Sequence, residues 1–407
     1  MTVIKIGEYK MDTLSEFQQS MPHGFDSIAI DIVGFCNAKC KYCPAGNDLT
    51  NKGKFIDPAL FEQILQKLIE YRFYSHSTNF HIYCIGEPCL HPQINTILRL
   101  LSKYNVRTTI STNASIVPAF ERDALESVDR FLISVPGFSQ SSYDKIHGFD
   151  FEIIKKNIIK LRKSVEELSD GRIKFDLSYH IYQFNEAEMV PAKAFCNTYD
   201  IRFAPNYAVM LDKDQCLDYV TGDMSFEELK DISKEIFLGV LDQQIKDAPR
   251  NYCDFQSRFL SVNVDGDIRI CSGFHRRKDP DIVIGNLITD HIDEIIWRKY
   301  HHPRCEKCIQ AGLTLSRGYE CKVYPDGYYD IMKENDFILE YLKDEKLQEK
   351  LRLLKLVRQY EQEDYKADLK QAIFNHVREY SLQPDIEKIA VSYTKFGLKT
   401  YKKIIEK

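Results

Sequence analysis

The sequence predicts an α/β fold: a partial TIM-like barrel of six β/α repeats, then a small α+β domain and a helical C-terminal region. Short β-rich runs alternate with amphipathic helical runs from Ser27 to about Met210, which is typical of a parallel sheet covered by helices. Six repeats are too few for a closed eight-stranded barrel, so we expect an open one. A cysteine-rich segment and a Lys/Glu/Leu-rich tail follow the repeats.

Changes in composition along the chain divide it into five segments. The predicted segments are an N-terminal extension at 1–25, the β/α core at 26–215, linker helices at 216–250, a cysteine-rich domain at 251–325 and a helical C-terminal region at 326–407. The last segment has the pattern of amphipathic helices. We therefore expect it to cover a core or contact a partner rather than to carry out catalysis.

The six repeats begin with short strands and continue into helices. The expected strands are 27–33, 80–86, 107–112, 131–137, 173–182 and 201–207, and the expected helices include 94–104, 118–127 and 151–168. A further helix should begin at Asp57-Pro58, with Asp57 as its N-cap and Pro58 at its first position. In a barrel of this kind, functional side chains are expected in the loops that follow the strands.

The charge balance excludes one broad class of function. The chain has 407 residues, with 55 Lys and Arg and 60 Asp and Glu, and its net charge of −5 excludes a strongly basic nucleic-acid surface as its main feature. No run of about 18 apolar residues predicts a membrane span. The N-terminal residues lack the apolar stretch of a signal peptide. We therefore expect neither a nucleic-acid partner nor a membrane partner.

The twelve cysteines are the least ordinary feature of the sequence. In a long chain without a signal peptide, they favour metal binding or chemistry over disulfides. Cys36, Cys40 and Cys43 form a C-x3-C-x2-C pattern in the loop after the first expected strand. Three thiolates in one loop can hold one face of an iron–sulfur cube and leave one iron open. The alternative is a structural zinc loop completed by a distant fourth ligand.

This pattern after the first strand of a β/α chain resembles the radical S-adenosylmethionine (SAM) superfamily, over roughly residues 26–210. The resemblance implies an enzyme with a [4Fe-4S] cluster on Cys36, Cys40 and Cys43. The open iron of that cluster chelates the amino and carboxylate groups of SAM. One electron then cleaves SAM to methionine and a 5′-deoxyadenosyl radical, which abstracts a hydrogen atom from the substrate.

The same resemblance implies SAM contacts at the ends of the next strands. Gly86-Glu87-Pro88 is similar to the Gly-Gly-Glu-Pro motif that holds the SAM amino group, with Ile85 in place of the first glycine. Tyr42 corresponds to the aromatic residue beside the adenine. The polar turn Ser111-Thr112-Asn113 ends the third strand, and Ser134 ends the fourth. The implied cofactor-binding residues are Tyr42, Gly86, Glu87, Pro88, Ser111, Asn113 and Ser134.

A second group of cysteines lies in the cysteine-rich segment. Cys253 and Cys271 flank a predicted β-hairpin with an Asp-Gly turn, and Cys305-x2-Cys308 follows. Four thiolates can complete a closed, fully cysteine-ligated site. A zinc ribbon is the alternative interpretation.

The C-x12-G-x4-C spacing from Cys253 to Cys271 resembles the SPASM/twitch extension of radical SAM enzymes. A full SPASM domain has seven cysteines, whereas this segment has five, so the resemblance favours the shorter twitch form with one auxiliary [4Fe-4S] cluster. We expect Cys253, Cys271, Cys305 and Cys308 to bind it. Cys321 leaves a second ligand set open, because Cys305, Cys308 and Cys321 also resemble the three-cysteine site of the molybdopterin-type cyclases.

An auxiliary cluster with four protein ligands has no open position for substrate, so it is expected to accept an electron. The spacing is similar to that of the twitch-bearing dehydrogenases of aminocyclitol biosynthesis. The resemblance therefore implies oxidation of a hydroxyl on a sugar-like or cyclitol-like small molecule. It also implies a flavodoxin or ferredoxin as reductant and, since the clusters need a reducing setting, a cytoplasmic location.

Two other functions stay open. The first is modification of a peptide or protein: thioether or C–C crosslinking, epimerisation or maturation. Many such enzymes carry a peptide-recognition domain before the barrel, whereas only about 25 residues precede the first strand here. The second is a metal-binding protein without catalysis, which would make the SAM-type motifs coincidental. Cys89 is a candidate hydrogen-atom donor, and the sequence identifies no general base.

Overall fold

The computed structural model of this protein describes residues 10–43, 45, 51–225, 251–274 and 280–314, together with a few residues between 226 and 250. Cys321 and the predicted helical region at 326–407 lie outside the described residues, as does part of the predicted linker at 216–250. No helix in the described part of the chain has the length and apolar character needed to cross a membrane.

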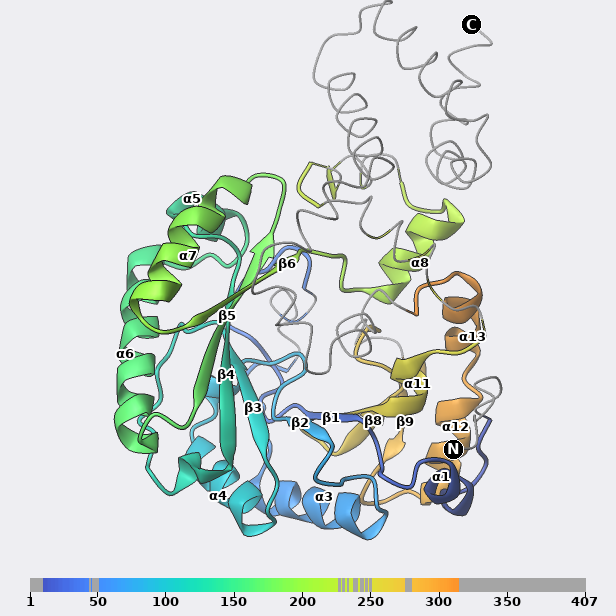
Figure 1. The fold of residues 1–407 in the computed structure, drawn as a ribbon. Coiled ribbons are helices and arrows are strands. Elements are labelled where there is room, and N and C mark those ends of the chain that lie inside the picture. The colour runs from blue at the N-terminus through green and yellow to red at the C-terminus, as the bar shows by residue number, and fades with distance from the viewer. Residues whose placement is uncertain are drawn as a thin grey trace, which may run out of the picture.

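Six parallel strands form the core sheet in chain order, as the sequence predicts (Figure 1). They are β1 Ser27–Ile30, β2 Asn79–His81, β3 Thr108–Thr112, β4 Val128–Val135, β5 Lys174–Ile181 and β6 Arg202–Tyr207. Each pairs in parallel with the next. The α/β class and the β/α order are therefore confirmed. The carboxyl ends of these strands lead toward one edge of the sheet, where the candidate site lies.

Helices cover the outer side of this curved sheet (Figure 1). They are α3 Pro58–Glu70, α4 Ile94–Lys103, α5 Gln140–Lys145, α6 Phe151–Ser169 and α7 Met189–Thr198. The Asp57 side chain caps α3 by accepting hydrogen bonds from the backbone N–H groups of Ala59 and Leu60. The prediction of a helix at 118–127 is wrong, because only a short 3-10 helix at Ala124–Ser127 forms there.

Three more strands extend the same sheet beyond β1. These are β7 Phe259–Val262, β8 Asp267–Arg269 and β9 Val283–Asn286. β7 pairs in parallel with β1, and β8 and β9 follow as antiparallel neighbours. The predicted hairpin between Cys253 and Cys271 is β7–β8, and Gly266 takes the φ of +84° that its turn requires. The cysteine-rich segment is thus joined to the core sheet through β1.

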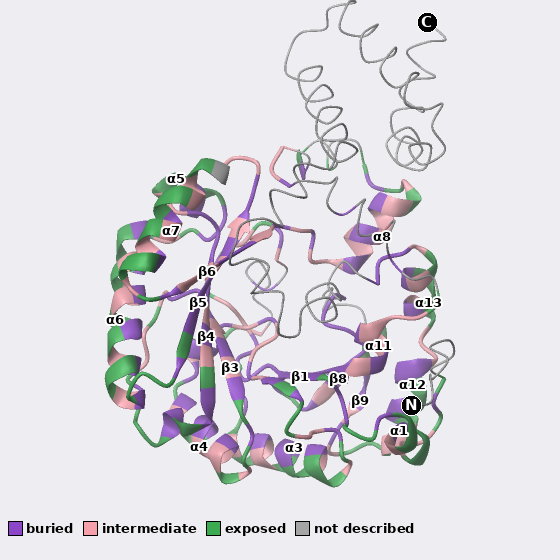
Figure 2. Cartoon of the chain, viewed as in Figure 1, coloured by how far each residue is buried: buried purple, intermediate pink, exposed green. Residues whose placement is uncertain are grey.

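Five helices pack around this extension and the N-terminus (Figure 1). They are α1 Leu14–Ser20, α8 Lys213–Thr221, α11 Asp254–Arg258, α12 Ile292–Tyr300 and α13 Pro303–Gln310. Figure 2 shows that the strands are largely buried while the helices expose their outer residues. All four residues of β1 are buried because the strand has a neighbour on each edge.

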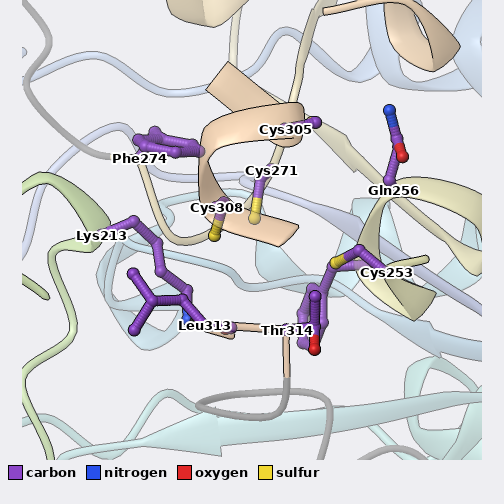
Figure 3. Close-up of a pocket in the computed structure, with 10 residues that line it drawn as sticks. Lys213, Cys253, Gln256, Cys271, Phe274, Cys305, Cys308, Leu313 and Thr314 are labelled. Atoms are coloured by element: carbon purple, nitrogen blue, oxygen red, sulfur yellow. Dashed lines mark hydrogen bonds between the residues drawn. The ribbon is translucent and has the colours of Figure 1, made fainter. Parts of the chain in front are cut away.

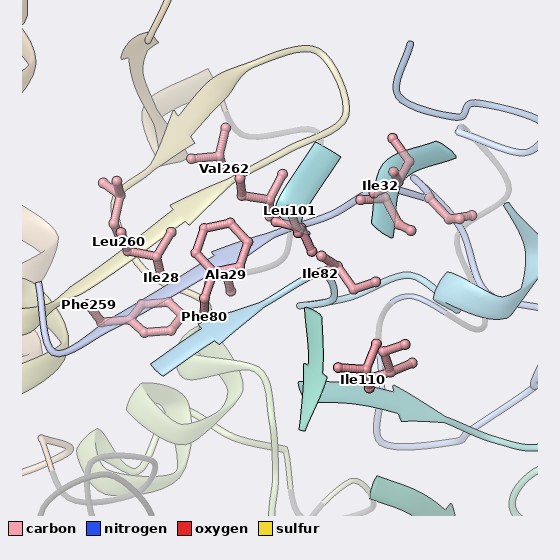
Figure 4. Packing of buried hydrophobic residues seen from close by; sticks show 14 of the residues in the cluster. Ile28, Ala29, Ile32, Phe80, Ile82, Leu101, Ile110, Phe259, Leu260 and Val262 are labelled. Atoms are coloured by element: carbon pink, nitrogen blue, oxygen red, sulfur yellow. The ribbon is translucent and has the colours of Figure 1, made fainter. Parts of the chain in front are cut away.

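The main hydrophobic core surrounds β1 (Figure 4). Ile28 of β1 lies beside Phe80 of β2 and Leu260 of β7, its partners in register. A second, smaller cluster of buried side chains contains Tyr42 from the first cysteine loop and Cys308 from the second cysteine group. This cluster therefore contains one residue from each of the two cysteine-bearing segments, whereas Cys271 and Cys305 belong to the main core.

Candidate active site and cysteine pocket

The first three predicted cysteine ligands lie in the loop that follows β1. Cys36, Cys40 and Cys43 form no disulfide bond and are half-buried. The Cys36 sulfur accepts a hydrogen bond from the backbone N–H of Ala38 at 3.4 Å. Burial, the Glu87 carboxylate and the Cys43 thiol raise the pKa of Cys36 to about 12, and burial and the other two thiols raise the pKa of Cys40. The three sulfurs therefore interact electrostatically in one loop.

Glu87 is tied to the end of β3 by its side chain. Its carboxylate is 3% exposed and caps the short 3-10 helix Pro88–Leu90 by accepting from the N–H of Cys89 at 3.0 Å. The same group accepts from the Thr112 hydroxyl at 2.8 Å and from the Asn113 backbone N–H at 2.8 Å. Burial raises the pKa of Glu87. The structure thus brings the Gly-Glu-Pro and Ser-Thr-Asn motifs together.

Asn113 also connects this pair of motifs to the cysteine loop. Its side-chain amide donates to the Cys36 sulfur at 3.6 Å and to the Asn37 side-chain oxygen at 3.0 Å. Three of the predicted features, namely the cysteine loop, Glu87 and Asn113, are therefore neighbours. They come from the carboxyl ends of β1, β2 and β3, where a barrel of this kind places its chemistry.

Gly86 is required by a close approach of two backbones. A Cβ atom at this position would lie 1.8 Å from the carbonyl oxygen of Val33, in the loop that follows β1. Ile85, which occupies the first glycine position of the motif, is buried. The motif does not end β2 as expected, because the strand stops at His81 and Gly86 lies in the loop beyond it.

The other predicted SAM contacts are placed separately. The Tyr42 ring stacks on Tyr182 with centroids 6.2 Å apart, and its hydroxyl donates to the Glu235 carboxylate at 2.5 Å. Burial and this hydrogen bond raise the pKa of Tyr42. Ser111 on β3 and Ser134 on β4 have half-buried side chains near the ends of their strands. Glu235 is a neighbour that sequence reasoning did not find, because it lies in the predicted linker.

The second cysteine group lines one pocket (Figure 3). Cys253 precedes α11, Cys271 follows β8, and Cys305 and Cys308 lie three residues apart on α13, hence on one helix face. All four thiols are free. In Figure 3 the sulfurs of Cys253, Cys271 and Cys308 face the space between their elements. The four residues that the sequence grouped are therefore together in space.

Two buried lysines accompany these cysteines, and sequence reasoning found neither. The Lys213 ammonium lines the pocket and donates to the Leu313 carbonyl oxygen at 2.8 Å. The Lys299 ammonium donates to the Phe259 carbonyl oxygen at 2.8 Å. Burial lowers the pKa of Lys299, and the thiols of Cys305, Cys271 and Cys253 oppose that shift.

Burial and the Lys213 ammonium shift the pKa values of the pocket thiols in opposite directions. Burial raises the pKa of Cys253 to about 11 and the pKa of Cys308 to about 12, and neighbouring thiols add to both shifts. Lys213 lowers the pKa of both cysteines. Iron binding replaces the thiol protons, so a buried cation beside four thiolates suits a cluster with net negative charge. The donor set of four sulfurs fits an iron–sulfur cluster.

The described residues do not contain three Cys, His, Asp or Glu side chains arranged as ligands of a single metal ion.

Cys84 lies in the loop after β2, where its sulfur accepts a hydrogen bond from the Ser261 hydroxyl at 3.6 Å. Cys89, the candidate hydrogen-atom donor, is 4% exposed, and its backbone N–H donates to the Glu87 carboxylate.

Comparison with known proteins identifies a family for the segment that holds the first site. The sequence pattern of the Radical SAM superfamily matches residues 30–189. S-adenosyl-L-methionine-dependent 2-deoxy-scyllo-inosamine dehydrogenase of Niallia circulans is 24% identical over 136 residues, which cover 31% of this chain and 53% of that protein. The chain therefore spans about half the length of this relative.

Several solved structures also align with the chain. SuiB of Streptococcus suis, bound to its precursor peptide SuiA, has a TM-score of 0.49 and 15% identity, over 73% of this chain and 70% of that chain. BtrN in complex with AdoMet and 2-DOIA has a TM-score of 0.38 and 18% identity, over 71% of this chain and 88% of that chain. At these scores the structural likeness adds nothing to the sequence match.

Proposed function

We propose, because the chain belongs to the radical SAM superfamily, that it dehydrogenates a hydroxyl group on a sugar-like or cyclitol-like small molecule. The family implies SAM and a [4Fe-4S] cluster, and the dehydrogenase named above supports a radical SAM oxidoreductase. The observation that carries the finer proposal is the pocket lined by four free cysteines on the extension of the core sheet. The dehydrogenase named above supports the substrate class.

In this proposal Cys36, Cys40 and Cys43 hold the SAM cluster, and residues of the Glu87–Asn113 group support SAM beside it. When bound, the cluster supplies one electron that cleaves SAM to methionine and a 5′-deoxyadenosyl radical. The chain's own residues fix the geometry: Glu87 and Asn113 connect the loops through hydrogen bonds, and buried side chains around Tyr42 exclude water.

The second pocket supports oxidation, because its four cysteines offer a site for an electron acceptor. Cys253, Cys271, Cys305 and Cys308 would supply all four ligands of one auxiliary [4Fe-4S] cluster, in an extension of the SPASM/twitch kind. Such a cluster has no open position for substrate and can take up an electron. Loss of a hydrogen atom, an electron and the hydroxyl proton converts a secondary alcohol to a ketone. The 5′-deoxyadenosyl radical would take the hydrogen atom and become 5′-deoxyadenosine, the auxiliary site would take the electron, and the proton would pass to solvent.

The same proposal includes the partners and location. A flavodoxin or ferredoxin would supply the electron for SAM cleavage, and the cytoplasm would supply the reducing setting that thiolate clusters need. A peptide substrate is the competing function, and the product analysis below separates it from oxidation of an alcohol.

The test combines metal analysis with product analysis. Anaerobic iron and sulfide quantitation should give about eight irons in the wild type and about four in each of two variants. One variant replaces Cys36, Cys40 and Cys43 by Ala, and the other replaces the four pocket cysteines by Ala. Cys196→Ala, a buried cysteine on α7, is the matched control and should keep all of the iron.

Product analysis then addresses the reaction. The first variant should form no 5′-deoxyadenosine, and the second should cleave SAM but form no ketone from a panel of aminocyclitols and sugars. About four irons in the wild type would overturn the auxiliary site. Turnover of peptides but of no alcohol in the panel would overturn the substrate class.

A further inference from the structure

We propose that Arg269, which lies outside the matched radical SAM segment, is a positioning residue for SAM. It acts through Asp31 on the loop that leads into Gly86-Glu87-Pro88. This inference rests on the proposed function, because it assumes that the Gly-Glu-Pro loop binds SAM. It adds a residue from the C-terminal hairpin to the requirements of the SAM site.

Asp31 holds the loop before Glu87 by its backbone. One carboxylate oxygen of Asp31 accepts hydrogen bonds from the N–H groups of Cys84, Ile85 and Gly86, at 2.8, 2.7 and 3.1 Å. Three consecutive backbone donors on one oxygen fix the conformation of this loop. Its backbone passes so close to Val33 that only glycine fits at position 86. A small displacement of the Asp31 side chain would therefore move the backbone of the Gly86-Glu87-Pro88 motif.

Arg269 fixes the other oxygen of the same carboxylate. Its guanidinium donates to Asp31 at 3.0 Å, and the side chains are 6% and 2% exposed. A buried carboxylate without its cationic partner takes up a proton or draws in water. Either change disturbs the acceptor that the three loop N–H groups share. The backbone N–H of Asp31 donates in addition to Val262 of β7 at 2.9 Å, so β7 and β8 hold Asp31 from both its backbone and its side chain.

The loop is thus fixed at both ends. Asp31 and Arg269 hold residues 84–86, and Thr112 and Asn113 hold Glu87. Arg269 lies two residues before Cys271, on the strand that leads to the cysteine pocket. The SAM loop and that pocket are therefore joined by one buried ion pair, and SAM affinity depends on the hairpin as well as on the radical SAM segment.

The experiment compares SAM dissociation constants of full-length reconstituted proteins at matched iron content. Arg269→Met removes the charge and keeps much of the side-chain length. Asp31→Asn keeps an acceptor oxygen but removes the ion pair, and Arg269→Lys restores a cation. Arg162→Met is the control: Arg162 is a buried arginine of α6 that pairs with Glu166 and Asp200 in the outer helical layer.

We expect Arg269→Met and Asp31→Asn to weaken SAM binding at least about tenfold, the range typical for loss of an outer partner of a bound group. Arg269→Lys should recover part of the affinity. In the two weakened variants, a correspondingly higher SAM concentration should be required to convert the electron paramagnetic resonance spectrum of the reduced cluster to that of its SAM-bound form. Arg162→Met should lower the melting temperature without changing the dissociation constant.

Wild-type SAM affinity in both Arg269→Met and Asp31→Asn would overturn the proposal, as would an equal loss of affinity in Arg162→Met. If Arg269→Met does not fold, Asp31→Asn and Arg269→Lys decide the result. Failure of the SAM site, the part of the proposed function that this inference uses, is distinguishable, because the wild type itself would then bind no SAM at the Cys36 loop.

Discussion

The carboxylate of Glu87 accepts a hydrogen bond from the backbone N–H of Asn113 at 2.8 Å. The Asn113 side chain then reaches the Cys36 sulfur at 3.6 Å. This connection links the loops after β1, β2 and β3 through two hydrogen bonds. The Glu87 carboxylate is buried and accepts hydrogen bonds from three donors. Its charge state and orientation therefore affect all three hydrogen bonds.

Glu87→Gln tests this connection. The amide retains one acceptor oxygen, but its NH2 group faces a donor that the carboxylate accepted, so one hydrogen bond is lost inside a buried site. We expect 5′-deoxyadenosine formation to fall roughly tenfold or more, since a buried unsatisfied donor costs about 1–3 kcal/mol. Iron content should stay unchanged. Glu62→Gln, at an exposed ion pair between α3 and α4, is the control and should keep wild-type activity.

Gly86→Ala tests the close approach of the two backbones. The added Cβ would lie 1.8 Å from the Val33 carbonyl oxygen, and the Asp31 hydrogen bond restrains the Gly86 backbone from moving away. We expect a loss of roughly 1–3 kcal/mol or more in the free energy of unfolding and loss of SAM binding. Gly34→Ala is the matched control, because its Cβ would first meet side chains, at 3.3 Å. Equal stability of the two variants would contradict the argument.

Local sequence signals predicted the strand order and the four-cysteine grouping, because strand period and motif spacing are local. Residues 238 positions apart, as Asp31 and Arg269 are, meet only because β7 pairs with β1, and no local signal encodes that pairing. The same holds for Lys213 and Leu313, which are 100 residues apart. The expected strand at 80–86 ends at His81, since Asp31 takes the N–H groups of residues 84–86.

Lys213→Met tests the buried cation in the cysteine pocket. Four thiolates give an iron–sulfur cluster net negative charge, and a nearby ammonium in a low-dielectric site stabilises its reduced form. We expect the midpoint potential of the proposed auxiliary cluster to become more negative by about 59 mV or more, a tenfold change for one electron. The measurement is a potentiometric titration in the variant that lacks Cys36, Cys40 and Cys43. An unchanged potential would contradict the role.

The control for this experiment is Lys103→Met. Lys103 lies on α4 in an exposed ion pair with Glu62, so its loss should leave the potential of the auxiliary cluster unchanged. Screening by water and salt makes exposed charges at a distance ineffective. A shift of the same size in both variants would show that total charge, and not the buried ammonium, sets the potential.

The buried side chain of His147 should make the free energy of unfolding depend on pH. This residue is 3% exposed, its Nδ1 atom has no hydrogen-bond partner among the described residues, and burial together with His180 lowers its pKa to about 3. An unfolded histidine has a pKa of about 6.5. Between these values the unfolded chain binds a proton that the folded chain does not bind. The contribution of His147 to the free energy of unfolding is therefore complete above pH 6.5 and is lost as the pH falls toward 3.

We expect His147→Gln to flatten this loss of stability. One such group contributes up to 1.36 kcal/mol per pH unit to the slope, so the free energy of unfolding should fall less steeply in the variant by about that amount. The measurement is urea denaturation of the apoprotein at pH values of about 7, 5.5 and 4.5. His76→Gln, at an exposed position, should keep the wild-type slope. Parallel slopes for wild type and His147→Gln would mean that His147 binds protons equally in the folded and unfolded chain, and the lowered pKa of the buried imidazole would have to be abandoned.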